Sequence, residues 1–99
     1  MARIIKTTGE VIEVAPKNGT DFSLEELQSI VGGYVEVIYL PDGHLILCDE
    51  DGRAKNKPYN HKATEEMHKA LGGKLGAYRL GWYFGIVGDV LVCNENQIG

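Results

Sequence analysis

Residues 22–49 read FSLEELQSIVGGYVEVIYLPDGHLILCD, and this stretch predicts a helix followed by two antiparallel strands. A capping box marks the helix start, because Ser23 can accept a hydrogen bond from the amide three residues on and Glu26 can reach back. The helix is expected to end at Gly32-Gly33, because glycine accepts the left-handed backbone conformation of a helix end. One face of the helix is apolar at helical spacing: Leu24, Leu27, Ile30 and Val31.

The rest of the stretch predicts a β-hairpin. A strand over residues 34–40 leads into the turn Pro41-Asp42-Gly43, and a return strand covers residues 44–49. Beyond it, Asp49-Glu50-Asp51 is typical of a solvated turn.

Working outward, the chain predicts three further elements. Two short β-prone runs at residues 4–5 and 11–14 surround Thr8-Gly9 and indicate an N-terminal hairpin. Asn60 is expected to cap a second helix over residues 61–71, and residues 86–93 are expected to form a final strand interrupted by Gly88-Asp89. The tail from residue 94 is expected to fray.

The element order ββαββαβ predicts an α+β fold, with a small, mostly antiparallel sheet carrying both helices on one face. A chain of 99 residues is expected to form a single domain. Within it we distinguish the N-terminal hairpin (1–20), a core (22–95) and a glycine- and aromatic-rich elaboration (72–85).

Charge is unevenly distributed along the chain. The net charge is −4, yet residues 53–79 hold seven of the ten basic residues and two of the fourteen acidic ones. An acidic chain is poorly suited to general nucleic-acid binding, whereas a local basic patch suits a small anion. The alternative is a solvated, charged helix face. With no apolar leader and no run of membrane-spanning length, we expect a cytoplasmic protein without membrane contact.

The elaboration GGKLGAYRLGWYFG at residues 72–85 suggests a binding surface for a flat, anionic molecule. Aromatic rings can stack on bases, and cations can meet phosphates. The candidates for stacking are Tyr78, Trp82 and Tyr83, and the candidates for phosphate contact are Lys57, Lys74 and Arg79. The alternative is a loop followed by a core strand.

Polar residues beside the apolar helix faces are candidates to line a cleft between the two helices. These are Gln28 on the first helix, and Asn60 and Thr64 on the second. Asp89, inside an apolar strand, needs a partner or water, and a structural ion pair is the alternative to a functional role. Asn60 has the alternative role of a helix cap alone.

Other site chemistry is not predicted. Neither zinc-ligand spacing nor a phosphate-cradling loop occurs, so we expect no metal and no cofactor. Cys48 and Cys93 alternate with apolar neighbours, which indicates buried thiols rather than nucleophiles.

Three blocks of sequence resemble the domain-of-unknown-function family 3846, which is found in phages, plasmids and bacteria. They lie in residues 24–43, 49–64 and 86–92, within a resemblance that covers about residues 22–95. Family-typical positions are Gln28, Gly32, Gly33, Asn60, Ala63, Thr64, Gly88 and Asp89. The family typically has a shorter link before the last strand, so residues 72–85 are specific to this member. The resemblance implies no enzyme class.

By analogy with small phage proteins, the resemblance suggests a non-enzymatic protein, expected to be a homo-oligomer, that sequesters an anionic nucleotide. An immune signalling nucleotide of the cyclic ADP-ribose type would be such a ligand. One alternative is a protein-interaction module that inhibits a host defence or restriction enzyme through its acidic surface. Another is an enzyme acting on a nucleotide derivative, with Asp89 or a histidine as base.

Overall fold

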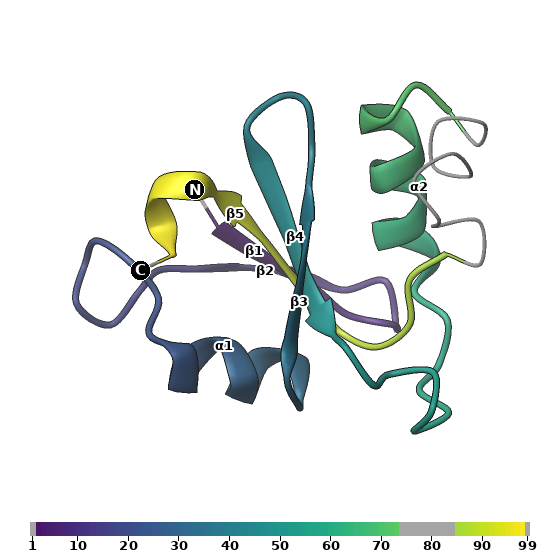
Figure 1. Ribbon diagram of the computed structural model, residues 1–99, viewed down its shortest axis with the longest axis horizontal. Helices are drawn as coiled ribbons and strands as arrows, with labels where there is room; N and C mark the ends of the chain where they lie inside the picture. The colour runs from purple at the N-terminus through teal and green to yellow at the C-terminus, as the bar shows by residue number, and fades with distance from the viewer. Residues whose placement is uncertain (1, 74–84, 99) are drawn as a thin grey trace.

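The computed structural model describes residues 2–73 and 85–98, which form a five-stranded antiparallel sheet flanked by two helices (Figure 1). The elements are β1 (Ala2–Ile5), β2 (Val11–Val14), α1 (Leu24–Val31), β3 (Val35–Tyr39), β4 (His44–Asp49), α2 (His61–Ala70), β5 (Val90–Asn94) and a 3₁₀ turn, η1 (Glu95–Gln97). The strand order across the sheet is β2-β1-β5-β4-β3. The predicted α+β class and element order are confirmed.

The central strand, β5, joins the two hairpins into one sheet. Val92 of β5 lies opposite Arg3 of β1 on one side and Ile46 of β4 on the other. The N-terminal hairpin is therefore part of the same sheet as the rest of the fold. The strand begins later than predicted, because Gly88 adopts a positive φ of 79° and breaks the extended run.

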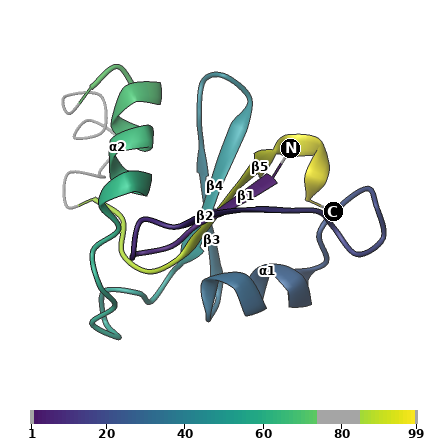
Figure 2. The ribbon, with the colours of Figure 1, turned by 180° about the vertical axis from the view of Figure 1, so that it is seen from behind.

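The prediction that both helices lie on one face of the sheet is wrong. Leu27 and Val31 of α1 pack with Leu45 and Leu47 of β4, whereas Met67 of α2 packs with the alternate residues of that strand. Figures 1 and 2 show α1 and α2 on opposite sides of the sheet. Successive strand residues point to opposite faces, and the sequences LILC in β4 and VLVC in β5 are apolar on both. Both faces therefore need cover.

The start and end of α1 are formed as predicted. The Ser23 hydroxyl accepts from the Glu26 amide at 3.2 Å, and Glu26 accepts from the Ser23 amide at 2.9 Å. Gly32 ends the helix with a φ of 80° and donates its amide to the Gln28 carbonyl. Local sequence signals were sufficient to predict both ends of α1, because all the groups that form them lie within ten residues of one another.

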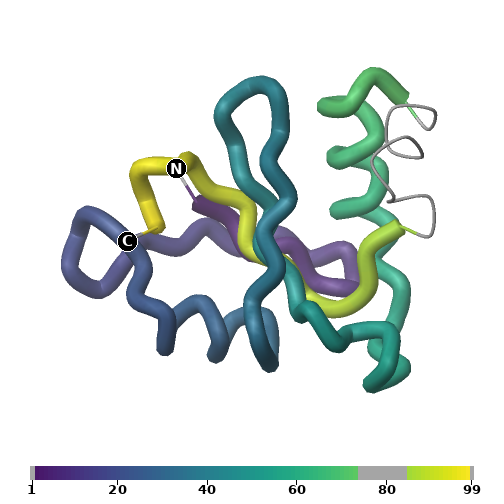
Figure 3. Tube along the Cα trace, in the orientation of Figure 1, coloured from purple at the N-terminus to yellow at the C-terminus, as the bar shows by residue number. Residues whose placement is uncertain are grey.

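The end of the chain is held in place, so the predicted fraying of the tail is wrong for residues 95–98. The Phe22 amide donates to the Gln97 carbonyl at 2.6 Å, and Phe22 and Ile98 form an isolated β-bridge. Figure 3 shows this end of the chain beside the loop that precedes α1. Ile98 thereby packs against the apolar cluster on the α1 side of the sheet.

Candidate functional site

Asn60 and Thr64, two of the predicted ligand-reading residues, are buried within the fold. The Asn60 amide donates to the carbonyls of Ile5 and Gly88, both at 2.9 Å, and its oxygen accepts from the Ala63 amide. The Thr64 hydroxyl accepts from the Ile86 amide at 2.9 Å. These bonds tie the segment before β5 to the start of α2. Both residues thus have a structural role: Asn60 caps α2 as predicted, but it is more than a cap, because it also bonds to Ile5 and Gly88.

The predicted cleft between the helices does not form, because the sheet separates them. Gln28 lies half-buried on α1, on the opposite side of the sheet from Asn60 and Thr64. The three residues therefore cannot read one ligand in this arrangement. The error follows directly from placing both helices on the same face.

Lys57, predicted to meet a phosphate, is paired with Asp49 at the end of β4. The ammonium groups of Lys57 and Lys55 each lie 2.8 Å from an Asp49 carboxylate oxygen. They also donate to the carbonyls of Val31 and Gly32, at 2.7 and 3.1 Å. We call this cluster of Asp49, Lys55, Lys57 and the end of α1 the lysine joint. It places positive charge where the helix dipole favours it.

The Asp49 side chain is fully buried in this joint, so the prediction that it lies in a solvated turn is wrong. Burial alone raises the pKa of Asp49, but hydrogen bonds from Lys55, Lys57 and the Asp51 amide outweigh it and lower the pKa to about 2. The carboxylate therefore stays charged at neutral pH. Sequence reasoning missed this because the lysines, six and eight residues on, fold back only through the turn at residues 50–56.

Lys57 and Asp89 are predicted site residues that the structure does bring together. They line a cavity of about 410 Å³ with Thr7, Gly88 and the end of α1. The Asp89 carboxylate accepts from the Thr7 amide at 3.0 Å, and no ion pair of Asp89 is seen among the described residues. The helix end disfavours an anion, and the two carboxylates of Asp49 and Asp89 together offset the charges of Lys55 and Lys57. This cavity is therefore poorly suited to a phosphate.

The remaining predicted ligand residues, Lys74, Tyr78, Arg79, Trp82 and Tyr83, lie outside the described residues, so their roles stay predictions.

Arg53, Tyr59 and His61 form a cluster of one cation and two aromatic rings close to Gly85, the first described residue after the gap. The Arg53 guanidinium donates to the Gly85 carbonyl at 2.6 Å. The Tyr59 ring lies so close that a Cβ on Gly85 would be 2.5 Å from it, and it meets His61 edge to face at 4.5 Å. Tyr59 is 39% exposed. This cluster has the chemistry of a stacking surface.

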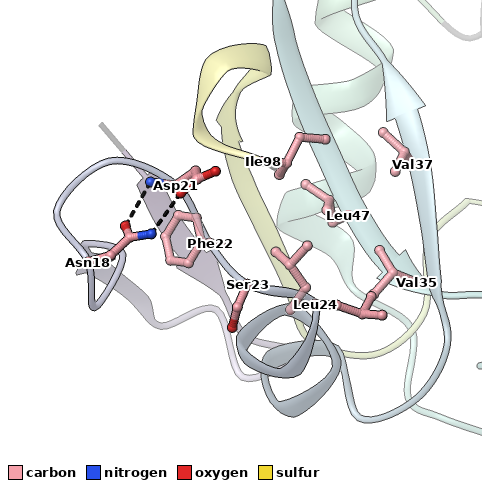
Figure 4. A pocket seen from close by; sticks show the side chains of 10 residues that line it. Asn18, Asp21, Phe22, Ser23, Leu24, Val35, Val37, Leu47 and Ile98 are labelled. Carbon is pink, nitrogen blue, oxygen red and sulfur yellow. Dashed lines mark hydrogen bonds between the residues drawn. The ribbon is translucent and has the colours of Figure 1, made fainter.

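An apolar groove that sequence reasoning missed runs between the start of α1 and β3 (Figure 4). Its volume is about 600 Å³. The apolar residues that line it are Phe22, Leu24, Leu27, Val35, Val37, Leu47 and Ile98. Leu24, assigned to the core face from helical spacing, is 63% exposed at the rim.

The groove exists because α1 is too short to cover its face of the sheet. An eight-residue helix is about 12 Å long and about 10–12 Å across, so in any orientation it covers less than the roughly 19 Å that five strands at about 4.8 Å spacing span. Apolar positions of β3 therefore remain uncovered beside the helix. The length of α1 and the number of strands could be predicted from the sequence. The groove could be predicted only if the two helices were also assigned to different faces of the sheet.

Among the residues that the structure describes, Asp21 is the only charged one that lines the groove. Its carboxylate accepts from the Asn18 side-chain amide at 2.7 Å (Figure 4). It also accepts from the Thr20 hydroxyl at 3.3 Å, and the two bonds fix its position. An apolar floor with a carboxylate at one end is suited to an apolar segment that carries a basic residue.

The thiols are buried as predicted. Burial raises the pKa of Cys48 to about 12 and that of Cys93 to about 11, so neither is a thiolate at neutral pH. Within the described ranges, no group of three or more His, Cys, Asp or Glu side chains could hold a metal ion. No helix in the same ranges is long and apolar enough to cross a membrane.

A family model described as Domain of unknown function (DUF3846) matches residues 1–99. The chain belongs to this family. The match includes the N-terminal hairpin, which the resemblance over residues 22–95 had left out. No curated protein and no solved structure matches the chain.

Three glycines, Gly32, Gly33 and Gly88, make room for the lysine joint. A Cβ on Gly32 would lie 2.8 Å from the Lys57 ammonium, and one on Gly33 would lie 2.5 Å from the Lys55 ammonium. A Cβ on Gly88 would lie 2.9 Å from the Lys57 side chain. In this DUF3846 protein the glycines at these positions therefore serve the packing of the joint.

Proposed function

We propose that this DUF3846 protein is a non-enzymatic interaction module that binds a partner protein through the groove between α1 and β3. The observation that carries the proposal is the exposed apolar surface of the groove, with Leu24 at its rim and Val35 and Val37 along its floor. Exposed apolar surface bordered by polar residues is typical of interaction sites. The volume of about 600 Å³ is enough for several side chains of a partner.

The partner segment should be apolar with a basic flank. Asp21 stands at the groove, and acidic residues outnumber basic ones twelve to three outside residues 53–79. Complementary charge would guide such a segment to the groove and fix its direction. A host defence or restriction enzyme, the partner class suggested by the sequence, would have to present a segment of this kind.

A peptide selection tests the proposal while the partner is still unidentified. The full chain is immobilised, and a random peptide library is selected on it. We expect enriched peptides that combine apolar residues with Lys or Arg, and whose synthetic forms bind in calorimetry. Failure to enrich any peptide would count against the groove as a protein-binding site.

Leu24→Asp is the decisive variant for the selected peptides. Leu24 is exposed and opens α1, where an acidic residue suits the helix dipole, so the fold should be retained. We expect at least about a tenfold loss of affinity, equivalent to about 1.4 kcal/mol. The matched control is Tyr59→Asp, on the other side of the molecule, which should leave peptide binding unchanged. Equal affinity of wild type and Leu24→Asp would contradict the proposal.

Nucleotide sequestration is the second candidate, and the cluster of Arg53, Tyr59 and His61 beside Gly85 favours it. Rings next to a cation suit a base and its phosphate, and the adjoining residues 74–84 would supply the other predicted contacts. Calorimetric titration with cyclic and ADP-ribose-derived nucleotides tests this candidate. We expect a nucleotide to bind, Tyr59→Ala to weaken the binding, and the bound nucleotide to be released unaltered. Absence of binding at tens of micromolar would reject this candidate. Recovery of an altered nucleotide would favour the enzyme alternative.

A further inference from the structure

The edge of β3 presents an open row of backbone hydrogen-bonding groups. Tyr34 and Leu40, which flank this strand, bond to the β4 side: the Leu40 amide donates to His44, and the Tyr34 carbonyl accepts from Glu50. Hydrogen-bonded pairs alternate along an antiparallel ladder, so even-numbered residues bond to β4. The amides and carbonyls of Val35, Val37 and Tyr39 therefore point out from the edge.

We propose that β3 pairs with β3 of a second copy of this chain, across a two-fold axis at Val37. In this register Val37 lies opposite its own counterpart, and Val35 lies opposite Tyr39. Every outward-pointing amide and carbonyl then meets a partner. The side chains brought together on the α1 side are apolar, and Tyr39, which is 65% exposed, would be covered.

Other registers and the other edge are less favourable. Centring the axis on Glu36 would oppose two carboxylates, and centring it on Ile38 would place Pro41, which has no amide hydrogen, against Val35. At the opposite edge of the sheet, β2 carries Glu13 among its outward-pointing residues and runs toward Pro16. In β3 the only edge charge is Glu36, which would lie opposite Ile38 in the proposed register.

The proposed dimer would have both grooves on one face of a continuous sheet, because its axis runs perpendicular to the sheet. This arrangement would let a partner with two apolar segments bind both subunits at once. The inference itself rests on the strand edge and does not require the groove to bind a partner.

Cysteine cross-linking of the full chain tests the register. Opposed residues in a hydrogen-bonded antiparallel pair have Cα atoms about 5.5 Å apart, within the range that a disulfide spans. Under mild oxidation we expect most of the Val37→Cys protein to become a covalent dimer. The matched control is Val35→Cys, which lies opposite Asp49 within its own chain and whose counterpart would be four residues along the partner strand, about 13 Å away, so it should stay largely monomeric. The native thiols are buried and should not react. Equal cross-linking of the two variants, or none, would overturn the proposal.

Sedimentation of the unmodified chain provides the second readout. We expect twice the mass of one chain at high micromolar concentration, and the mass of one chain for Tyr39→Lys under the same conditions. Leu24→Asp should still dimerise, so a failed groove and a failed dimer are distinguishable. A monomeric wild type at these concentrations, or an undiminished Tyr39→Lys dimer, would overturn the inference.

Discussion

At the scale of single residues, Asp49 holds distant parts of the domain together. Its buried carboxylate links two lysines to the carbonyl end of α1. Because the folded-state pKa is lowered from 3.8 to about 2, the carboxylate stabilises the fold above about pH 4. This contribution falls as the pH drops below that value and is lost once the pH passes below about 2.

Asp49→Asn should lower the free energy of unfolding at pH 7 by about 2 kcal/mol, because the neutral amide leaves both lysines unpaired. Urea unfolding at pH 7 and near pH 2 measures this, and the difference from wild type should shrink at the lower pH. Asp51→Asn, at an exposed carboxylate nearby, is the control and should have little effect. A deficit of the same size at both pH values would show that the charge of Asp49 is not the cause.

Thr64→Val should lower the free energy of unfolding by about 1–2 kcal/mol, because it keeps the shape of the side chain but leaves the buried Ile86 amide without its acceptor. Thr64→Ser retains the hydroxyl and should lose less. Chemical denaturation of the three proteins checks this order. If Thr64→Val were as stable as wild type, the structural role assigned to Thr64 would be wrong.

The roles of single polar residues could be predicted only in part. The Asn60 cap was found because its partner, Ala63, lies three residues away. The two carbonyls that its amide meets, at Ile5 and Gly88, are far away in the sequence and depend on the sheet topology. The position of Asn60 beside an apolar helix face therefore indicated that its side chain is buried. That position alone gave no reason to assign the side chain to a ligand.

At the scale of elements, α1 depends on its capping box. Ser23→Ala removes the acceptor of the Glu26 amide and should destabilise the protein by about 1 kcal/mol. Ser29→Ala, at an exposed position on the same helix, should have little effect. Thermal unfolding monitored by circular dichroism measures both. Equal melting temperatures for Ser23→Ala and wild type would contradict the role of the cap.

The elements themselves were readable from the sequence, because caps, turns and alternation act over a few residues. Both hairpins and both helices follow the predicted ranges closely. The interruption at Gly88-Asp89 was predicted from the sequence, but the start of β5 only after it was not, because residues 86–88 bond instead to the distant segment before α2, through the bridge of Val87 to Tyr59.

At the scale of the whole molecule, placing the helices on opposite faces changes where a partner can bind. The cleft predicted from Gln28, Asn60 and Thr64 is replaced by the groove beside α1, which exists because one short helix covers that face alone. The apolar runs of β4 and β5 were the available signal, since strands that are apolar on both faces need cover on both.

The groove as a protein-binding site is the central claim, and an NMR titration tests it most directly. Labelled full-length protein is titrated with the peptide enriched by selection, and shifts of the backbone amides are mapped. We predict that the largest shifts cluster at Leu24, Val35, Val37 and Ile98, and that Leu24→Asp abolishes them. Shifts centred on Arg53, Tyr59 and His61 instead, with the groove amides unmoved, would contradict the account.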